Sequence, residues 1–272
     1  MVSNINLKIE DDLEIALKAS KKAGDIIMKY YKHDYEINEK GYHNPVTTAD
    51  KEADSFLKNT LLDARPDYGW LSEETIDSTS RLSKERVWIV DPLDGTKEFI
   101  EGVSQFVVSV GLVQNGKPIV GVLHNPATNE TFYGGSGYGT FLNDEEFAVT
   151  KKNSLRNMTI LNSRSETRRG LWDPFKNSFK KLEPIGSVAY KMGLTAVGKA
   201  DVFATLRPKN EWDVCAGVCL INEAGGISID LNGNELEFNK KKTLIEPGII
   251  AGYNLSVEKT FKELNKEQIT IG

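Results

Sequence analysis

The chain is organised around one stretch, Val87-Trp88-Ile89-Val90-Asp91-Pro92-Leu93-Asp94-Gly95-Thr96-Lys97-Glu98-Phe99-Ile100. Its first four residues are apolar, with β-branched and aromatic side chains, which is typical of a buried strand. We expect the strand to break at Asp91-Pro92, because proline fixes its own φ and pushes the preceding residue into an extended conformation. The chain should then restart at Gly95-Thr96 as the first turn of a helix.

Two carboxylates, Asp91 and Asp94, lie where this strand ends. Crowded carboxylates repel each other, and a hard divalent cation with oxygen ligands would supply the missing positive charge. The backbone N–H groups of Gly95 and Thr96 would point outward at the helix start, ready for an anion such as phosphate. Together these features indicate metal-assisted phosphoryl chemistry. The alternative is purely structural, since Asp-Pro and Asp-Gly are ordinary turn dipeptides and aspartate caps helices.

The composition narrows the class of protein. The 272 residues are enough for a large core, in one domain or two closely joined halves. A net charge of −5 argues against a general nucleic-acid binder. Residues 1–12 contain no apolar core of a secretory signal, and no run approaches the ~18 apolar residues that a membrane helix needs. We therefore expect a cytoplasmic protein with neither a nucleic-acid polymer nor a membrane as partner.

The cysteines and histidines do not indicate a zinc site. Cys215 and Cys219 fall on one face of a helical pattern, but zinc needs more ligands. The three histidines, His33, His43 and His124, form no cluster in the sequence. We interpret the cysteines as small core residues in a reducing compartment.

Two helices are expected before the central stretch. The first is capped by one of the aspartates at residue 11 or 12 and runs to about residue 32, with apolar residues at helical spacing on one face. The second is capped by Thr47 or Thr48 and ends before Pro66. Asp50 would lie in its first turn, where its purely structural role would be to favour the helix dipole.

A short apolar strand at Tyr68-Gly69-Trp70-Leu71-Ser72-Glu73-Glu74 ends in two acids. The alternative is that these charged side chains only keep the strand end exposed to water. Glu73 gains interest because a second acidic strand end, Asp91, follows soon after. The polar segment Thr75 to Arg86 is predicted as a mobile surface loop.

A β-rich region and then a mixed α/β region follow the central stretch. Asn115-Gly116 is a strong hairpin signal. The other expected strands are 106–113, 118–124, 131–134, 139–142, 158–161, 201–205, 227–231, a strand ending at Phe238, and 249–251. The expected helices run from Gly186 to Val197, from Trp212 to a C-cap at Gly225-Gly226, and from Ser256 onward. The change of pattern predicts two halves, an α+β half at 1–150 and an α/β half at 151–272 that completes the active site.

Five acids from separated segments share one kind of position. Each lies at a predicted strand end or helix start, where ligand sites of α/β folds gather. They are Asp50, Glu73, Asp91, Asp94 and Asp213. Such a set could hold two or three Mg²⁺ ions.

Three motifs carry a resemblance to a known family. They are Trp70-Leu71-Ser72-Glu73-Glu74, Asp91-Pro92-Leu93-Asp94-Gly95-Thr96, and Trp212-Asp213-Val214-Cys215-Ala216-Gly217 with Glu223-Ala224-Gly225-Gly226. In order and spacing they resemble the inositol monophosphatase superfamily, which are Mg²⁺-dependent, lithium-sensitive phosphomonoesterases. The resemblance implies an α/β fold, the layered αβαβα sandwich of the sugar phosphatases.

Within the superfamily the chain looks most like the 3'(2'),5'-bisphosphate nucleotidases. Lys97-Glu98-Phe99-Ile100 and Glu211-Trp212-Asp213 carry this likeness, whereas inositol monophosphatases more typically have Thr-Asn-Phe after Asp-Gly-Thr. That branch converts adenosine 3',5'-bisphosphate into AMP and phosphate. The alternatives are an inositol 1-phosphate phosphatase, a phosphatase of another sugar or polyol phosphate, or a non-catalytic metal-binding scaffold.

The resemblance also implies roles for individual residues. The first metal would be bound by Glu73, Asp91 and the Leu93 carbonyl, and the second by Asp91, Asp94 and Asp213. A third, weaker ion would lean on Glu73. Asp50 and Thr96 would orient and deprotonate a water that attacks the phosphorus directly. The substrate would contact Glu73, Leu93, Asp94, Gly95, Thr96, Lys191 and Asp213.

Lys191 lies in Gly186-Ser187-Val188-Ala189-Tyr190-Lys191, where the nucleotidases usually have Gly-Ser-Ser-Leu-Lys. A lysine here, together with Lys97, would meet the second anionic group of a bisphosphate. The alternative is that both are solvated surface charges. The expected partner is a small phosphorylated metabolite, and the expected assembly is a monomer or homodimer.

Overall fold

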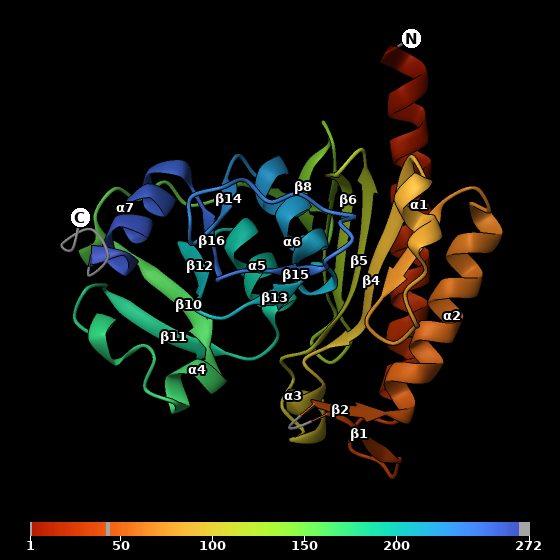
Figure 1. The fold of residues 1–272 in the computed structure, drawn as a ribbon, viewed down its shortest axis with the longest axis horizontal. Coiled ribbons are helices and arrows are strands. Elements are labelled where there is room, and N and C mark those ends of the chain that lie inside the picture. The colour runs from red at the N-terminus through yellow and green to blue at the C-terminus, as the bar shows by residue number, and fades with distance from the viewer. Residues whose placement is uncertain (1, 42–43, 267–272) are drawn as a thin grey trace.

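The computed structural model describes residues 2–41 and 44–266, and it confirms the layered αβαβα sandwich (Figure 1). The first sheet has seven strands, and only its β3–β4 pair is parallel. Helices α1 (Val2–Met28) and α2 (Thr48–Ala64) cover one face of this sheet. In spatial order the strands are β3 (Gly69–Ser72), β4 (Arg86–Asp94), β5 (Val107–Gln114), β6 (Lys117–Asn125), β7 (Glu130–Gly135), β8 (Gly139–Leu142) and β9 (Glu145–Phe147).

The second sheet has five strands. Helices α5 (Val188–Ala196) and α6 (Glu211–Glu223) fill the layer between the two sheets, and α7 (Asn254–Leu264) covers the outer face. Successive side chains of a strand point to opposite faces, so Ile249 packs inward with α5 and α6 while Ile250 packs outward with α7. In spatial order the strands are β11 (Lys181–Ile185), β10 (Thr159–Ser163), β12 (Val202–Thr205), β16 (Ile249–Gly252) and β14 (Ile227–Asp230).

Several short elements were not predicted from sequence patterns. They are the hairpin β1 (Ile37–Gly41) and β2 (Asn44–Thr47), the pair β13 (Lys209–Asn210) and β15 (Leu244–Ile245), α4 (Arg164–Arg168), and 3-10 turns at Thr79–Ser83, Leu155–Asn157 and Asp173–Phe175. The expected helix after Gly95 is present as α3 (Thr96–Ile100). The chain passes from the first sheet to the second between β9 and β10, close to residue 150, and the division into halves there stays a prediction.

Locally encoded features are confirmed. Thr47 caps α2, and Asn115 and Gly116 adopt φ values of 51° and 79° in the β5–β6 turn. Cys215 and Cys219 are buried and free on α6, as expected of core residues. Gly121 permits the close contact of β6 with this helix, because an added Cβ would lie 2.4 Å from the Ala216 carbonyl oxygen.

Other predictions from the sequence are wrong. Strand β4 does not break at Asp91-Pro92 but continues to Asp94, because a bulge between Asp91 and Asp94 interrupts the ladder where proline has no N–H to donate. The strand predicted to end at Phe238 is absent, and only an isolated bridge joins Ile229 to Glu235. The first helix begins at Val2 and ends at Met28.

Residue Asp12 is not a helix cap. Its side chain is fully buried and accepts hydrogen bonds from Arg65 Nε at 2.6 Å, Arg86 Nη1 at 2.6 Å and the Tyr68 hydroxyl at 2.9 Å. The carboxylate therefore ties α1 to the end of α2 and to β3 and β4. Nothing in the local sequence indicates this role, because its partners lie more than fifty residues away in the chain.

Asp12→Ala should destabilise the protein strongly. Removing one partner of a buried ion pair leaves an uncompensated charge, here Arg86, and costs about 3–5 kcal/mol. Urea denaturation checks this, with Glu14→Ala as the control, because Glu14 forms an exposed pair with Lys18 on the same helix. A small effect of Asp12→Ala, similar to that of Glu14→Ala, would contradict the structural role.

The segment between β3 and β4 lies at the surface, as predicted, but it is anchored by the buried Arg81. Arg81, with 2% of its surface exposed, donates to both carboxylate oxygens of Asp77, to Asn239 Oδ1 at 2.6 Å and to the Lys240 carbonyl at 2.9 Å. Glu211 in turn accepts from the Asn239 and Lys240 amides. These bonds fasten the segment after β3 to the start of α6, so the predicted mobility is not supported.

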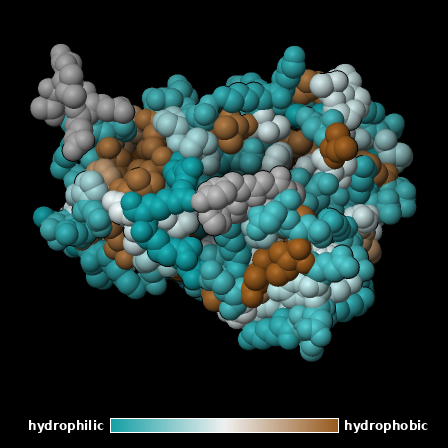
Figure 2. Space-filling view, turned by 60° about the horizontal axis from the view of Figure 1, so that its bottom comes forward, coloured by the Kyte–Doolittle hydropathy of each residue, from teal (hydrophilic) through white to brown (hydrophobic). Residues whose placement is uncertain are grey.

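No described helix is both long and apolar enough to cross a bilayer. The face in Figure 2 is mainly hydrophilic, with apolar side chains in separate patches.

Candidate active site

A polar cavity of about 350 Å³ lies between the two sheets. Its wall is formed by β4 and α3 on one side and by α4, the β11–α5 turn, β13 and the start of α6 on the other. Four of the five predicted acids line it, and the fifth, Asp50, is bonded to the lining residue Thr96. The sequence thus predicts this assembly of acids correctly.

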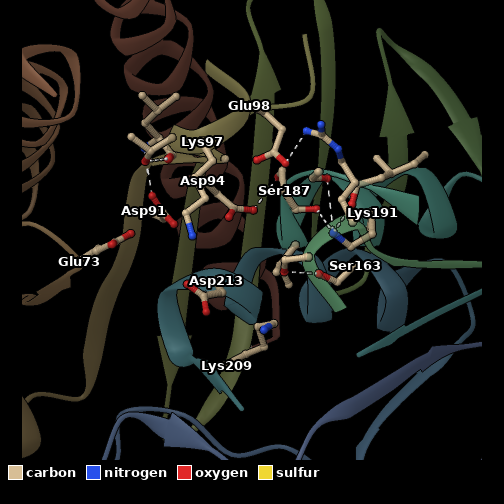
Figure 3. A pocket seen from close by; sticks show the side chains of 18 of the residues that line it. Glu73, Asp91, Asp94, Lys97, Glu98, Ser163, Ser187, Lys191, Lys209 and Asp213 are labelled. Carbon is tan, nitrogen blue, oxygen red and sulfur yellow. Dashed lines mark hydrogen bonds and ion pairs between the residues drawn. The ribbon is translucent and has the colours of Figure 1, made fainter. Parts of the chain in front are cut away.

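Three acids form a cluster that suits a metal ion. Glu73 after β3, Asp91 on β4 and Asp213 on α6 each offer a carboxylate oxygen, and these oxygens lie within 4.8 Å of one another. Figure 3 shows the three side chains extending toward a common space. Asp91 Oδ1 accepts from the Leu93 amide at 3.0 Å, and Asp213 Oδ2 accepts from the Asn210 amide at 2.8 Å. One oxygen of each aspartate remains for a hard cation such as Mg²⁺.

Asp94 lies beside this cluster but is held differently. Its Oδ2 accepts from the Ser187 hydroxyl and from the Ala189 amide, both at 2.6 Å. The N-terminal end of α5 therefore fixes an acid that β4 of the first sheet carries. Oδ1 is left as the oxygen that could bind a metal, and the role of Asp94 as a ligand stays a prediction.

Asp50 and Thr96 form a bonded pair at the edge of the cavity. Asp50 is the third residue of α2, and its Oδ2 accepts from the Thr47 amide at 2.7 Å and the Thr47 hydroxyl at 2.5 Å in a capping box. The Thr96 hydroxyl lies 3.0 Å from Asp50 Oδ1 and 3.1 Å from the Leu93 carbonyl. When that hydroxyl donates to Asp50, its oxygen lone pairs can accept a hydrogen bond from water.

The turn between β4 and α3 requires a glycine. Gly95 adopts a φ of 104°, and a Cβ there would lie 2.7 Å from the Gln105 carbonyl oxygen. Only glycine tolerates both restrictions. This turn places Thr96 and its neighbours on the cavity wall.

The acids raise one another's proton affinity. Burial, followed by the charges of Glu73, Asp94 and Asp213, raises the pKa of Asp91 well above its usual range. Burial, followed by the charges of Asp94 and Glu73, raises the pKa of Asp213 to about 8. Burial also raises the pKa of Asp50. Deprotonated carboxylates at these positions are unfavourable without a neutralising cation, so the donor set fits Mg²⁺.

Without Mg²⁺, the thermal midpoint should fall as pH rises from about 4 to about 8. The Asp213 pKa is about 8 in the folded protein against an ordinary 3.8, so the folded state binds more protons than the unfolded state in this range. Stability present at low pH is therefore lost as pH rises. Thermal scans at several pH values check this. Asp213→Asn should flatten the dependence, and Mg²⁺ should restore the midpoint at pH 8. A thermal midpoint that does not change with pH in the metal-free wild type would contradict the raised pKa of Asp213.

Cations also line the cavity. Lys97 and Lys191 were expected, whereas Arg164 and Arg168 of α4 and Lys209 of β13 were not. Sequence patterns could not find the last three because their short elements were not predicted. The only available signal was the spacing of the two arginines, four apart, which puts them on one helical face.

The structure contradicts the solvated-surface alternative for Lys191, and its role as a substrate-binding residue stays a prediction. Lys191 is buried, so it is not a solvated surface charge. Its ammonium already donates to backbone carbonyls of the β11–α5 turn. Arg164 is also engaged, through Nη1 to Glu98 and Nη2 to Glu101 at 2.8 Å each.

Comparisons with known proteins show the family to which the chain belongs. A model of the inositol monophosphatase family matches residues 8–268. Inositol monophosphatase 3 from Solanum lycopersicum is 33% identical, over 87% of this chain and 92% of that protein. The 3'(2'),5'-bisphosphate nucleotidase CysQ from Aggregatibacter actinomycetemcomitans is 32% identical, over 90% of this chain and 92% of that protein. The solved IMPase from Thermotoga maritima has a TM-score of 0.84 at 30% identity and covers 96% of this chain and 100% of its own.

The chain belongs to the inositol monophosphatase family. It is accordingly a phosphatase, a hydrolase of phosphate monoesters. The family includes both inositol monophosphatases and bisphosphate nucleotidases, so membership alone leaves the substrate open.

Proposed function

We propose that this phosphatase is Mg²⁺-dependent and acts on a small metabolite with two anionic groups, with adenosine 3',5'-bisphosphate as the first candidate and AMP and phosphate as its products. The observation that carries the proposal is the cluster of Glu73, Asp91 and Asp213 beside the Asp50–Thr96 pair. A scaffold that only binds metal needs no such hydrogen-bonded pair.

The pair would prepare the attacking water. With its proton directed at Asp50, the Thr96 oxygen can accept a hydrogen bond from a water molecule, and Asp50 can receive the proton in turn. The raised Asp50 pKa favours this transfer. No covalent intermediate is required, because the water attacks the phosphorus directly.

Mg²⁺ held by Glu73, Asp91, Asp213 and, in the second site, Asp94 would neutralise the phosphate oxygens and lower the pKa of the attacking water. The Leu93 carbonyl is the further ligand in this proposal. The resemblance also implies inhibition by lithium, a small monovalent ion that would leave the product's charge under-neutralised.

The cations that line the cavity support a second anionic group on the substrate. Lys97 of α3 and Arg168 of α4 have exposed side chains, and Lys209 of β13 also lines the cavity. An inositol phosphate would present hydroxyls there, which do not need this much positive charge. Trp212 also lines the cavity and adds an aromatic side chain of the kind that contacts nucleobases.

Inositol 1-phosphate remains the second candidate. Arg164 is neutralised by Glu98 and Glu101, which reduces the positive charge open to a second phosphate. The similar Solanum lycopersicum protein is named an inositol monophosphatase. A panel of adenosine 3',5'-bisphosphate, fructose 1,6-bisphosphate and inositol 1-phosphate separates the candidates.

Arg168→Ala should raise KM for adenosine 3',5'-bisphosphate roughly tenfold or more, because a hydrogen bond to a charged group contributes about 1.5–3 kcal/mol. The same change should affect inositol 1-phosphate little. Steady-state phosphate release measures both. Arg169→Ala is the matched control, since this neighbouring arginine is exposed and does not line the cavity. Equal losses on both substrates, or a wild-type preference for inositol 1-phosphate, would favour the second candidate.

A further inference from the structure

Lys191 is an unusual buried cation. Only 2% of its surface is exposed, and its Nζ lies 2.5 Å from the Ser187 carbonyl oxygen, 3.0 Å from that of Ile185 and 3.4 Å from that of Gly186. A lysine ammonium has three N–H donors, so three successive carbonyls account for all of them. None is left for a phosphate of the substrate.

The carbonyls converge because the backbone turns in an unfavourable way. Ser187 has φ 54° and ψ 127°, outside the regions that residues with a side chain prefer. Such a conformation costs roughly 1–3 kcal/mol and persists only where surrounding contacts impose it. The Lys191 ammonium contacts all three carbonyls of this turn, and the Gly186 amide donates to Gln105 Oε1 at 2.8 Å.

The strained turn orients two hydrogen-bond donors toward Asp94. It directs the Ser187 hydroxyl and the Ala189 amide at the same oxygen, Asp94 Oδ2. Ser187 Oγ also accepts from the Tyr190 amide at 3.0 Å, which leaves its own hydrogen for Asp94. Figure 3 shows Asp94 facing Ser187, with the Lys191 ammonium behind that serine.

We propose that Lys191 is a positioning residue for Asp94: it holds the Ile185–Ser187 turn so that two donors fix Asp94 Oδ2 and leave Oδ1 for the second metal. This rests on the proposed function, in which Asp94 is a ligand of that metal. Lys191 lies on α5, between the two sheets, and acts through the β11–α5 turn on an acid of the first sheet.

The inference predicts a loss of metal affinity, whereas direct contact with substrate predicts a loss of substrate affinity. Lys191→Met keeps the length of the side chain and removes the charge. Titration calorimetry with MgCl₂ should show two binding events in the wild type. In Lys191→Met the binding event that Asp94→Asn abolishes should lose at least about tenfold in affinity, while the other changes little. Lys199→Met is the control, because Lys199 pairs with Glu130 at a half-exposed position just after α5.

A glycine at position 187 tests the coupling through the turn. Glycine adopts a positive φ without strain. Ser187→Gly alone should weaken the second Mg²⁺ event by removing one donor to Asp94. In the Ser187→Gly background, Lys191→Met should cost clearly less than in the wild type, because the turn no longer depends on the ammonium. Additive effects would show that Lys191 acts in some other way and would overturn the inference.

A fallback variant keeps the inference testable, and several results would overturn it. If Lys191→Met fails to fold, Ser187→Ala provides the test. It removes the hydroxyl that donates to Asp94 and leaves the buried Lys191 ammonium in place. Wild-type Mg²⁺ affinity in a folded Ser187→Ala or Lys191→Met variant would overturn the inference, as would a selective rise in KM for the bisphosphate. Asp94→Asn should abolish the second event. Failure of the wild type to bind Mg²⁺ would overturn the proposed function as well, so the two failures are distinguishable.

Discussion

Asp91→Asn is expected to abolish phosphate release, with a loss of roughly a thousandfold or more in kcat. Asp91 is buried, and it contributes an oxygen to the cluster with Glu73 and Asp213. An asparagine amide carries no negative charge to attract Mg²⁺, so Mg²⁺ binding should weaken together with turnover. Phosphate release at saturating substrate and calorimetric titration with MgCl₂ measure the two effects.

The control for this variant is Asp144→Asn. Asp144 is exposed and bonded to the Tyr133 hydroxyl, away from the cavity. It should leave both measurements unchanged. Wild-type Mg²⁺ affinity in a folded Asp91→Asn protein would contradict the assignment of Asp91 to the metal site.

Asp50→Asn and Thr96→Ala are expected to reduce kcat by about 10²–10⁴, the range typical of a positioned acid or base. KM should change little, because the pair acts on water and not on the substrate. Since the two groups share one hydrogen bond, the double variant should lose little more than either single variant. Steady-state kinetics of the three proteins test this.

Thr96→Ser serves as the matched variant for this pair. It keeps the hydroxyl that reaches Asp50 and should retain much of the activity. Additive losses in the double variant, or a rise in KM alone, would instead indicate that the two residues bind the substrate.

Local sequence signals predicted much of the fold. The capping box of Thr47 and Asp50 and the Asn115-Gly116 turn involve neighbours in the chain, so their physics is visible in the sequence. The meeting of Glu73, Asp91 and Asp213 was also predictable, because acids at strand ends and helix starts gather at one edge of an α/β fold.

Features that depend on distant partners were not predictable. Asp12 is placed like a helix cap, yet its arginine partners reach it from α2 and β4. Pro92 is typical of a strand break, but the bulge beside it removes the need for an N–H donor. The sequence favoured a substrate-binding role for Lys191. It could not reveal the three carbonyl partners of the ammonium, because residue types do not encode the strained backbone of Ser187.

The most direct test is phosphate release from adenosine 3',5'-bisphosphate by the wild type, first with all divalent metal chelated and then with increasing Mg²⁺. We predict no release with chelator and a saturable rise as Mg²⁺ is restored, with Asp91→Asn inactive at every concentration. Release that is undiminished in the chelated enzyme, or that persists in Asp91→Asn, would contradict metal-dependent catalysis at the cluster of Glu73, Asp91 and Asp213.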